Sequence, residues 1–203
     1  KRPPMPWKRL LHDREIIGLF LFRVTYTACI GIIWGFLPVL ADIEFSISSA
    51  GIGFLVMLGV FISGAINMPM GYVADRLNRN LMIIIGGILV SGAMVYFAQA
   101  KHITDLVTAS IIFGLGGGIS MPAHTAISVF KGNETDAMGS LMGLMTMAHS
   151  LGMLAGSTLA GVMMDAFQLR DAFSFGAVVR FLGYPTFPRI NRAVRTKSNN
   201  RVA

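Results

Sequence analysis

The chain has 203 residues, of which 54% are hydrophobic and only 13% are charged, whereas a soluble domain carries about 25% charged residues. The mean hydropathy of +0.64 agrees with this bias. Together they exclude a disordered chain, a collagen, a coiled coil and an ordinary cytosolic enzyme, and they leave an integral membrane protein. The single cysteine, Cys29, excludes a disulfide framework and a cysteine-based metal site.

Six apolar segments predict an all-α, polytopic membrane fold, because a membrane helix needs about 20 largely apolar residues. Five are long enough, and the sixth is short and contains Arg180 and Pro185. The predicted spans are Ile16–Leu40, Ser49–Gly71, Leu81–Ala100, Asp105–Val129, Met138–Met164 and Ala172–Phe187. We therefore expect a basic leader at 1–15, a six-helix bundle at 16–187 and a basic tail at 188–203.

The positive charges are distributed unevenly among the short connections. If the spans alternate across a membrane, fourteen Lys and Arg residues fall on one side, six of them from Arg180 onward, and two fall on the other. Positive loops stay in the cytoplasm. This asymmetry predicts an even number of spans in a plasma (inner) membrane, with both termini cytoplasmic.

The most distinctive string, GYVADRLNRN, begins at Gly71 and connects the second and third predicted spans. Gly71 is suited to ending a helix where a neighbouring backbone approaches. Asp75 is suited to capping the next helix, since a carboxylate is stabilised at a helix N-terminus. Arg76 and Arg79 would hold the loop in the cytoplasm and pair with acids. From spacing alone, a simple positively charged turn is an equally good interpretation.

This string resembles the signature G-x-x-x-D-R-x-x-R-[RK] of the major facilitator superfamily of secondary transporters, with Asn80 departing where a basic residue is usual. The resemblance implies one six-helix half of a twelve-span carrier, and the basic leader favours the C-terminal half. It also implies that Asp75, Arg76 and Arg79 form a cytoplasmic gate, with Gly71 as its close-packing point. The general look is that of drug/proton antiporters.

Arg23 is the one charged residue deep within the first predicted span. Residues on the same helix face form a mostly polar and aromatic stripe: Tyr26, Thr27, Ile30, Trp34 and Pro38. A charge at this depth costs a few kcal/mol unless it faces water or a partner. One interpretation is therefore that Arg23 lines a cavity and pairs with an anion. The alternative is that its side chain extends toward the cytoplasmic surface.

The fourth predicted span contains the run Gly114–Gly118, followed by Pro122 and His124. No strand precedes the run and no third glycine completes a nucleotide-binding pattern, so we exclude a phosphate-binding loop. A bendable, closely packed helix fits better. His124 is either a candidate proton or substrate residue or a histidine hydrogen-bonded within the protein interior.

The fifth predicted span divides into three faces. A methionine and histidine face is the cavity candidate, because methionine adapts to varied ligands and His149 can take up a proton near neutral pH; it contains Met138, Met142, Met145 and His149. Small residues form helix seams, and the glycines expected to pack are Gly139, Gly143, Gly152, Gly156 and Gly161. A leucine-rich face that includes Leu141 and Leu144 is expected to contact lipid. His149, like His124, can equally be an interior packing residue.

No catalytic pattern, metal-ligand spacing or cofactor motif is visible, so we expect no enzyme, metal or cofactor, and no nucleic-acid partner. The favoured function is a secondary transporter that moves a small amphipathic or drug-like solute outward by alternating access, in exchange for H⁺. No acid lies inside a span, so the proton site would be His149, His124 or an acid of a missing N-terminal half; a homodimer is the other route to a complete carrier. The alternatives are a small organic anion paired with Arg23, and a non-transporting membrane scaffold or inactive fragment.

Overall fold

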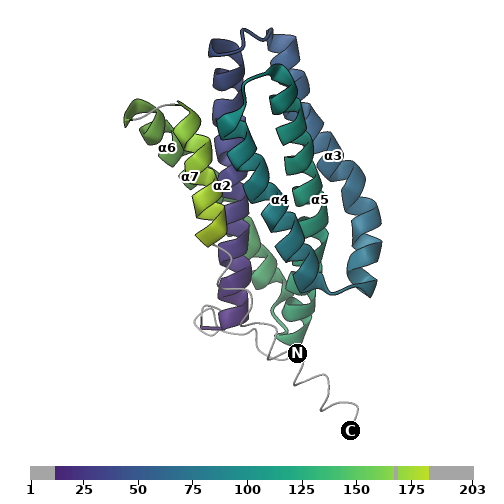
Figure 1. The fold of residues 1–203 in the computed structure, drawn as a ribbon. Helices are drawn as coiled ribbons and strands as arrows, with labels where there is room; N and C mark the ends of the chain where they lie inside the picture. Colours follow the sequence, from purple (N-terminus) through teal and green to yellow (C-terminus); the bar gives the residue numbers. More distant parts are fainter. Residues whose placement is uncertain (1–11, 167–168, 183–203) are drawn as a thin grey trace.

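The computed structural model describes residues 12–166 and 169–182. Within them the chain forms six helices that run up and down as an antiparallel bundle, and these residues contain no strand (Figure 1). The helices are α2 (Arg14–Ile43), α3 (Ser49–Arg76), α4 (Arg79–Gln99), α5 (Ile103–Glu134), α6 (Met138–Ala166) and α7 (Leu169–Leu182). The predicted all-α fold is confirmed.

Short polar side chains begin three of the helices. Asp13 caps α2, Ser48 caps α3 and Asn78 caps α4, each through a side-chain oxygen that accepts a backbone N–H. The oxygen of Asn78 accepts the N–H of Asn80 at 3.1 Å. The prediction that Asp75 caps this helix is therefore wrong, because α3 continues through Arg76 and only Asn78 is within reach of the first turn of α4.

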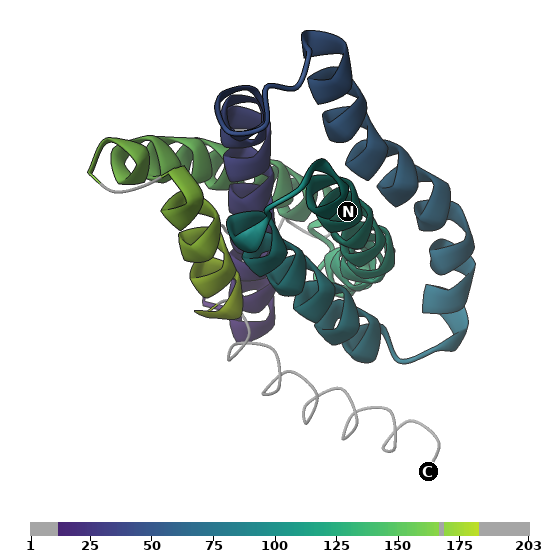
Figure 2. The same ribbon diagram turned by 45° about the horizontal axis from the view of Figure 1, so that its top comes forward.

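The bundle has α5 packed between α3 and α4, while α2 packs against α6 and α7 packs on α4 and α2. Figures 1 and 2 show α3 at one edge and α6 with α7 at the other. Five helices, α2 to α6, are long and apolar enough to cross a membrane. The described part of the expected span Ala172–Phe187 belongs to α7, which has 14 described residues. Residues 183–187 lie outside the described part, as do the leader to residue 11 and the tail from 188.

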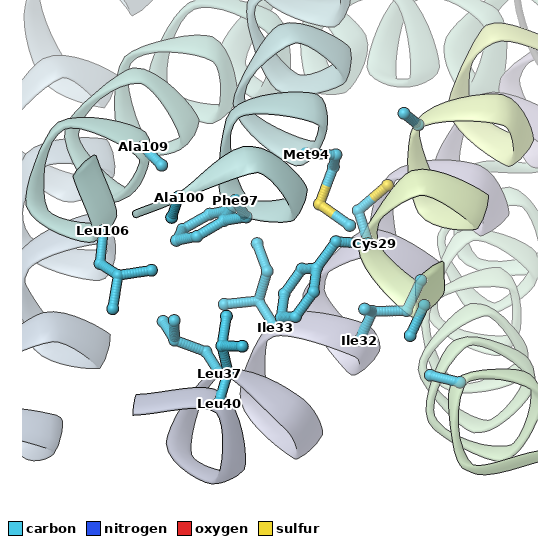
Figure 3. Close-up of a cluster of buried hydrophobic side chains, with 14 of the residues drawn as sticks. Cys29, Ile32, Ile33, Leu37, Leu40, Met94, Phe97, Ala100, Leu106 and Ala109 are labelled. Carbon is cyan, nitrogen blue, oxygen red and sulfur yellow. The ribbon is translucent and has the colours of Figure 1, made fainter. Parts of the chain in front are cut away.

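Two clusters of buried apolar side chains hold the bundle together. The first joins α2 from Tyr26 to Ala41 with α4, α7 and the start of α5, and Figure 3 shows Cys29, Met94 and Phe97 within it. The second joins α2 from Ile16 to Phe22 with the start of α4, the end of α5 and the start of α6. Arg23 therefore lies on α2 between two apolar layers.

The leucine-rich face of α6 does not lie wholly toward lipid. Leu141 and Leu144 are buried in the second cluster, whereas Leu151, Leu159 and Val162 are exposed. The expectation of one lipid-facing side is wrong for the first two turns of the helix, because there α6 packs beside the N-terminal part of α2.

Arg180 is buried within the bundle, with only 1% of its surface exposed. Its Nη1 donates to the carbonyl of Phe22 at 3.1 Å and to Oγ1 of Thr25 at 3.1 Å, and its guanidinium lies 4.1 Å from the centre of the Phe22 ring. These two hydrogen bonds and the ring face offset part of the lost hydration of the cation. Arg180 therefore does not count among the exposed basic residues that follow the sixth predicted span, and the topology prediction depends on the other basic residues.

Candidate functional site

A cavity of about 260 Å³ lies between α2, α5 and α6, and Arg23 contributes its charge. We call it the Arg23 cavity. Its lining residues are Arg23, His124, Thr125, Ser128, Met142, Met145, Thr146 and His149. The structure thus brings together five of the residues singled out as cavity candidates, although they come from three predicted spans.

Arg23 lies against a neighbouring helix rather than extending to the end of its own. Its Nη1 lies 2.8 Å from the sulfur of Met121 on α5, and its Nε is buried without a hydrogen-bond partner among the described residues. A thioether is a weak acceptor. Arg23 thus lies at the cavity, and its side chain contacts α5.

The two histidines of the Arg23 cavity differ in how they are held. His124 is buried; its Nε2 lies 3.1 Å from the carbonyl of Leu19, and its ring stacks on Phe22 with 5.2 Å between ring centres. His149 is half-buried, and its Nδ1 is buried with no partner in the described part of the chain. His124 therefore has a structural hydrogen bond, and His149 keeps a ring nitrogen available to a ligand.

No carboxylate of the described residues lines the Arg23 cavity. All ten acidic residues of the chain lie among the described residues, each at a helix end or in a connection. They are Asp13, Glu15, Asp42, Glu44, Asp75, Asp105, Glu134, Asp136, Asp165 and Asp171. Three of them surround Lys131 at one end of the bundle, with Glu15 at 2.6 Å, and Glu44 pairs with Arg170 at the other end. The charge of Arg23 therefore has no ion-pair partner among the described residues.

Tyr26 and Trp34 line a second cavity of about 290 Å³ between α2, α3 and α5. We call it the Trp34 cavity. Trp34 is 52% exposed, whereas Tyr26 is buried. The cavity also contains Asn67, whose Oδ1 is buried and has no partner among the described residues. Sequence reasoning missed Asn67, although a lone amide in an apolar span was the signal that could have found it.

Thr27 does not line either cavity. It is fully buried, and its hydroxyl donates to the carbonyl of Arg23 at 2.9 Å, where α2 meets α6. A Cβ added at Gly152 would collide with Thr27, and one added at Gly156 would lie 2.7 Å from the Cα of Ala28. Thr27 thus belongs to the seam between α2 and α6, together with these two glycines.

The other three glycines of α6 do not make close contacts within the described chain. A Cβ added at Gly139 or Gly143 would meet nothing within 4 Å, and one at Gly161 would make only an ordinary contact with Phe36. Gly139 and Gly143 lie exposed at the start of α6, and a packing role for them remains a prediction that would need a contact outside the described residues.

The loop motif spans the end of α3 and the start of α4. Arg79 donates through Nε to the carbonyl of Ala74 at 3.0 Å, and its Nη2 lies 3.8 Å from the carboxylate of Asp75. The guanidinium of Arg76 lies 4.3 Å from the centre of the Tyr72 ring. A Cβ on Gly71 would meet nothing within 4 Å, so Gly71 makes no close contact with another described helix.

A groove of about 710 Å³ runs beside this motif, between the end of α3 and the second half of α5. We call it the loop groove. Gly71, Asp75 and Arg79 line one side, and residues of α5 from Met121 to Asn133 line the other. The side chain of Asp75 is 74% exposed. Three of the four motif residues therefore face an open groove rather than a packed interior.

Long apolar helices, cavities between them and acidic residues confined to helix ends and connections define a polytopic α-helical membrane protein. A family model described as Major Facilitator Superfamily matches residues 16–201, and the chain belongs to this family of membrane transporters. It is therefore not an enzyme.

Three curated relatives illustrate the similarity. An uncharacterized MFS-type transporter of Methanocaldococcus jannaschii is 26% identical over 183 residues, covering 90% of this chain and 47% of the relative. Multidrug resistance protein 2 of Bacillus subtilis is 27% identical, and the match covers 88% of this chain and 44% of the relative. Quinolone resistance protein NorA of Staphylococcus aureus is 25% identical, and the match covers 85% of this chain and 44% of the relative. The chain thus spans about half the length of these relatives.

Proposed function

We propose that this chain is one half of a secondary transporter that moves a small amphipathic or drug-like solute out of the cell by alternating access. The Arg23 cavity carries the proposal: it lies between three membrane-length helices, combines two flexible methionines with polar groups, and is open to a ligand. Methionine side chains adapt to ligands of different shape. The names of two relatives, a multidrug and a quinolone resistance protein, support efflux.

The complete carrier requires a second six-helix bundle, either a complementary half or a second copy of this chain. In this family, solute sites lie near the membrane midplane between two repeats, and the repeats rock against each other. The loop groove, with Asp75 and Arg79 on its edge, is the proposed cytoplasmic contact between the two bundles. Both termini are proposed to be cytoplasmic, in the plasma membrane.

Exchange for protons is the proposed source of energy. His149 is the one residue of the Arg23 cavity with a ring nitrogen that is buried and unpartnered among the described residues. The charged and titratable groups that face it are Arg23 from α2 and His124 from α5. The proton acceptor is therefore either His149 or an acid supplied by the second bundle.

An efflux assay in a drug-sensitive bacterium tests the proposal. The chain is expressed alone and together with the half of Bacillus subtilis Multidrug resistance protein 2 that it does not match. We expect energised cells that contain both parts to expel a neutral fluorescent dye such as Nile red, and a protonophore to stop the efflux. Membrane insertion is checked in parallel by fractionation.

The pattern of efflux decides between the forms of the carrier. Efflux that requires the added half identifies the chain as half of a heteromeric or longer carrier, and efflux from the chain alone identifies a homodimer. Efflux that continues in the presence of the protonophore would contradict proton coupling. Absence of efflux from inserted protein in both forms would overturn the drug-efflux proposal.

A further inference from the structure

Arg23 and His149 present two buried nitrogen atoms with no partner in the described part of the chain, and both residues line one cavity. A buried donor without an acceptor costs about 1–3 kcal/mol, and more when the group is charged. The thioether of Met121 contacts Nη1 of Arg23 but supplies no compensating negative charge. The positive charge of Arg23 therefore lacks a compensating negative charge, which an anionic ligand can supply.

The described residues do not supply the missing negative charge, because no carboxylate among them lines the cavity. Its ten acidic residues all lie at helix ends or in connections, and the ion pairs among the described residues join them to Lys131, Arg170 and Arg79. A cation is disfavoured as occupant, because the guanidinium of Arg23 is already present and no described carboxylate faces it. An oxyanion fits, since a guanidinium donates two parallel hydrogen bonds to a carboxylate or a similar group.

The other lining residues indicate what is attached to that oxyanion. Met142 and Met145 supply an apolar, adaptable wall beside the polar groups. A volume of about 260 Å³ lies below the range of about 300–1,000 Å³ usual for drug-sized ligands, so the cavity accommodates a head group and part of an apolar body. The remainder of the ligand would extend toward the second bundle.

We propose that the Arg23 cavity binds the anionic head group of an amphipathic solute, with Arg23 as the charged anchor and Nδ1 of His149 as a second hydrogen-bond donor. The proposal rests on the proposed transport function and names its substrate class as amphipathic organic anions. An anion held at Arg23 attracts a proton to His149 rather than displacing one. The proton that is exchanged therefore resides on the second bundle.

A set of dansyl probes tests this preference, because the probes share one fluorophore and differ in charge. The chain is reconstituted in nanodiscs of phosphatidylcholine and titrated with dansylglycine, an anion, dansylamide, which is neutral, and dansylcadaverine, a cation. We expect dansylglycine to bind about tenfold more tightly than dansylamide, equivalent to about 1.4 kcal/mol. Equal affinity for the three probes would overturn the proposal without any variant.

Two substitutions on α2 locate the anchor. Arg23→Gln should remove the preference for dansylglycine over dansylamide, and Arg23→Lys should retain part of it. Arg14→Gln is the matched control, because Arg14 is exposed at the first turn of the same helix; it should leave the preference unchanged. A preference that survives Arg23→Gln, or that Arg14→Gln also removes, would overturn the assignment to Arg23.

The source of the anion is distinguished by lipid composition. If the ligand is a solute, dansylglycine affinity should be the same in nanodiscs that also contain phosphatidylglycerol. Displacement of the probe by phosphatidylglycerol would overturn the proposal that the bound anion is a solute, and would show that the cavity binds a lipid head group. The assay needs no gradient and no second bundle, so a failure of efflux with an intact probe preference would contradict the transport proposal alone.

Discussion

Asp75 combines exposure with a position at the edge of an open groove. Its carboxylate lies 3.8 Å from Arg79 and is 74% exposed. An exposed pair of this kind contributes about 0–1 kcal/mol to stability. The pair is therefore too weak to explain the residue by folding alone, and a contact with the second bundle through the loop groove is its proposed role.

Replacing Asp75 with Asn should impair transport while the protein stays folded in the membrane. The substitution keeps the shape of the side chain and removes its charge, so contacts across the loop groove weaken and the rate of dye efflux should fall several-fold. Asp165→Asn is the control, since Asp165 is an exposed acid near the end of α6. Efflux kinetics equal to those of the unsubstituted protein would show that Asp75 does not act as part of a gate.

Single residues also mark the limit of what the sequence predicts. The helical angle groups Arg23 with a polar stripe, because such a stripe on an apolar helix needs only local spacing, and in the structure Arg23 lines a cavity. The same angle grouped Thr27 with the cavity, although Thr27 faces α6. The charge count includes Arg180 with the cytoplasmic basic residues, whereas its partners Phe22 and Thr25 lie on a helix more than 150 positions earlier in the chain. Such partners are invisible to spacing arguments.

At the scale of elements, contacts through glycine determine which helices can be neighbours. On α5, Gly114 faces the carbonyl of Gly59 on α3, and Gly116 faces the carbonyl of Gly86 on α4. Because these two glycines point to different sides of α5, the helix can approach both α3 and α4 closely. On α6, Gly156 faces the backbone of Ala28 on α2. Membrane helices associate through this kind of close packing, because burial from water does not drive them together.

An alanine placed at Gly156 should destabilise the fold, although alanine is ordinarily the better helix former. A Cβ there would lie 2.7 Å from both C and Cα of Ala28, and these backbone atoms cannot rotate away. We expect a loss of about 1–3 kcal/mol, the usual cost of overpacking, and a lower melting temperature of the purified protein in detergent.

Gly143→Ala is the matched control on the same helix, because an added Cβ there meets nothing within 4 Å. The intrinsic preference of about 1 kcal/mol for alanine over glycine should then maintain or raise the melting temperature. Equal shifts for the two variants would show that the seam at Gly156 is looser than the structure indicates.

The positions of the helices were more predictable from the sequence than the helices that each of them packs against. Apolar length alone located the helices α2 to α6 to within a few residues, because a span must be long and apolar whatever it packs against. The faces of α6 were only partly predicted: Leu141 and Leu144 are as apolar as a lipid-facing residue and are nevertheless buried. In a membrane, hydrophobicity does not distinguish an interior from an exterior position, so face assignments need the neighbouring helices.

At the scale of the whole molecule, burial is unequal among the spans. In the apolar window of α2, 61% of residues are buried, whereas in that of α3 only 6% are. The exposed face of α3 includes Phe54, Phe61 and Met68. Helix α2 is thus a central element of this bundle, and α3 is the helix with most apolar surface left for lipid or for a second bundle.

The single cysteine of the chain makes the orientation of the bundle accessible to thiol labelling. Cys29 is buried, and its Sγ lies 3.6 Å from the carbonyl of Gly176. A serine hydroxyl can make the same contact, so Cys29→Ser should give a folded background without thiols. Ile43→Cys and Leu77→Cys then introduce one thiol each at exposed positions, the first before α3 begins and the second just after it ends.

The two introduced thiols should lie on opposite sides of the membrane, because α3 is long enough to cross it. The connection that follows position 43 carries no Lys or Arg, whereas Arg76 and Arg79 flank position 77. Because positive loops stay in the cytoplasm, a membrane-impermeant maleimide should label the Ile43→Cys variant in intact cells and the Leu77→Cys variant only after permeabilisation. The reverse pattern would place the loop groove outside the cell and contradict a cytoplasmic gate, and equal labelling of both variants in intact cells would contradict a single orientation.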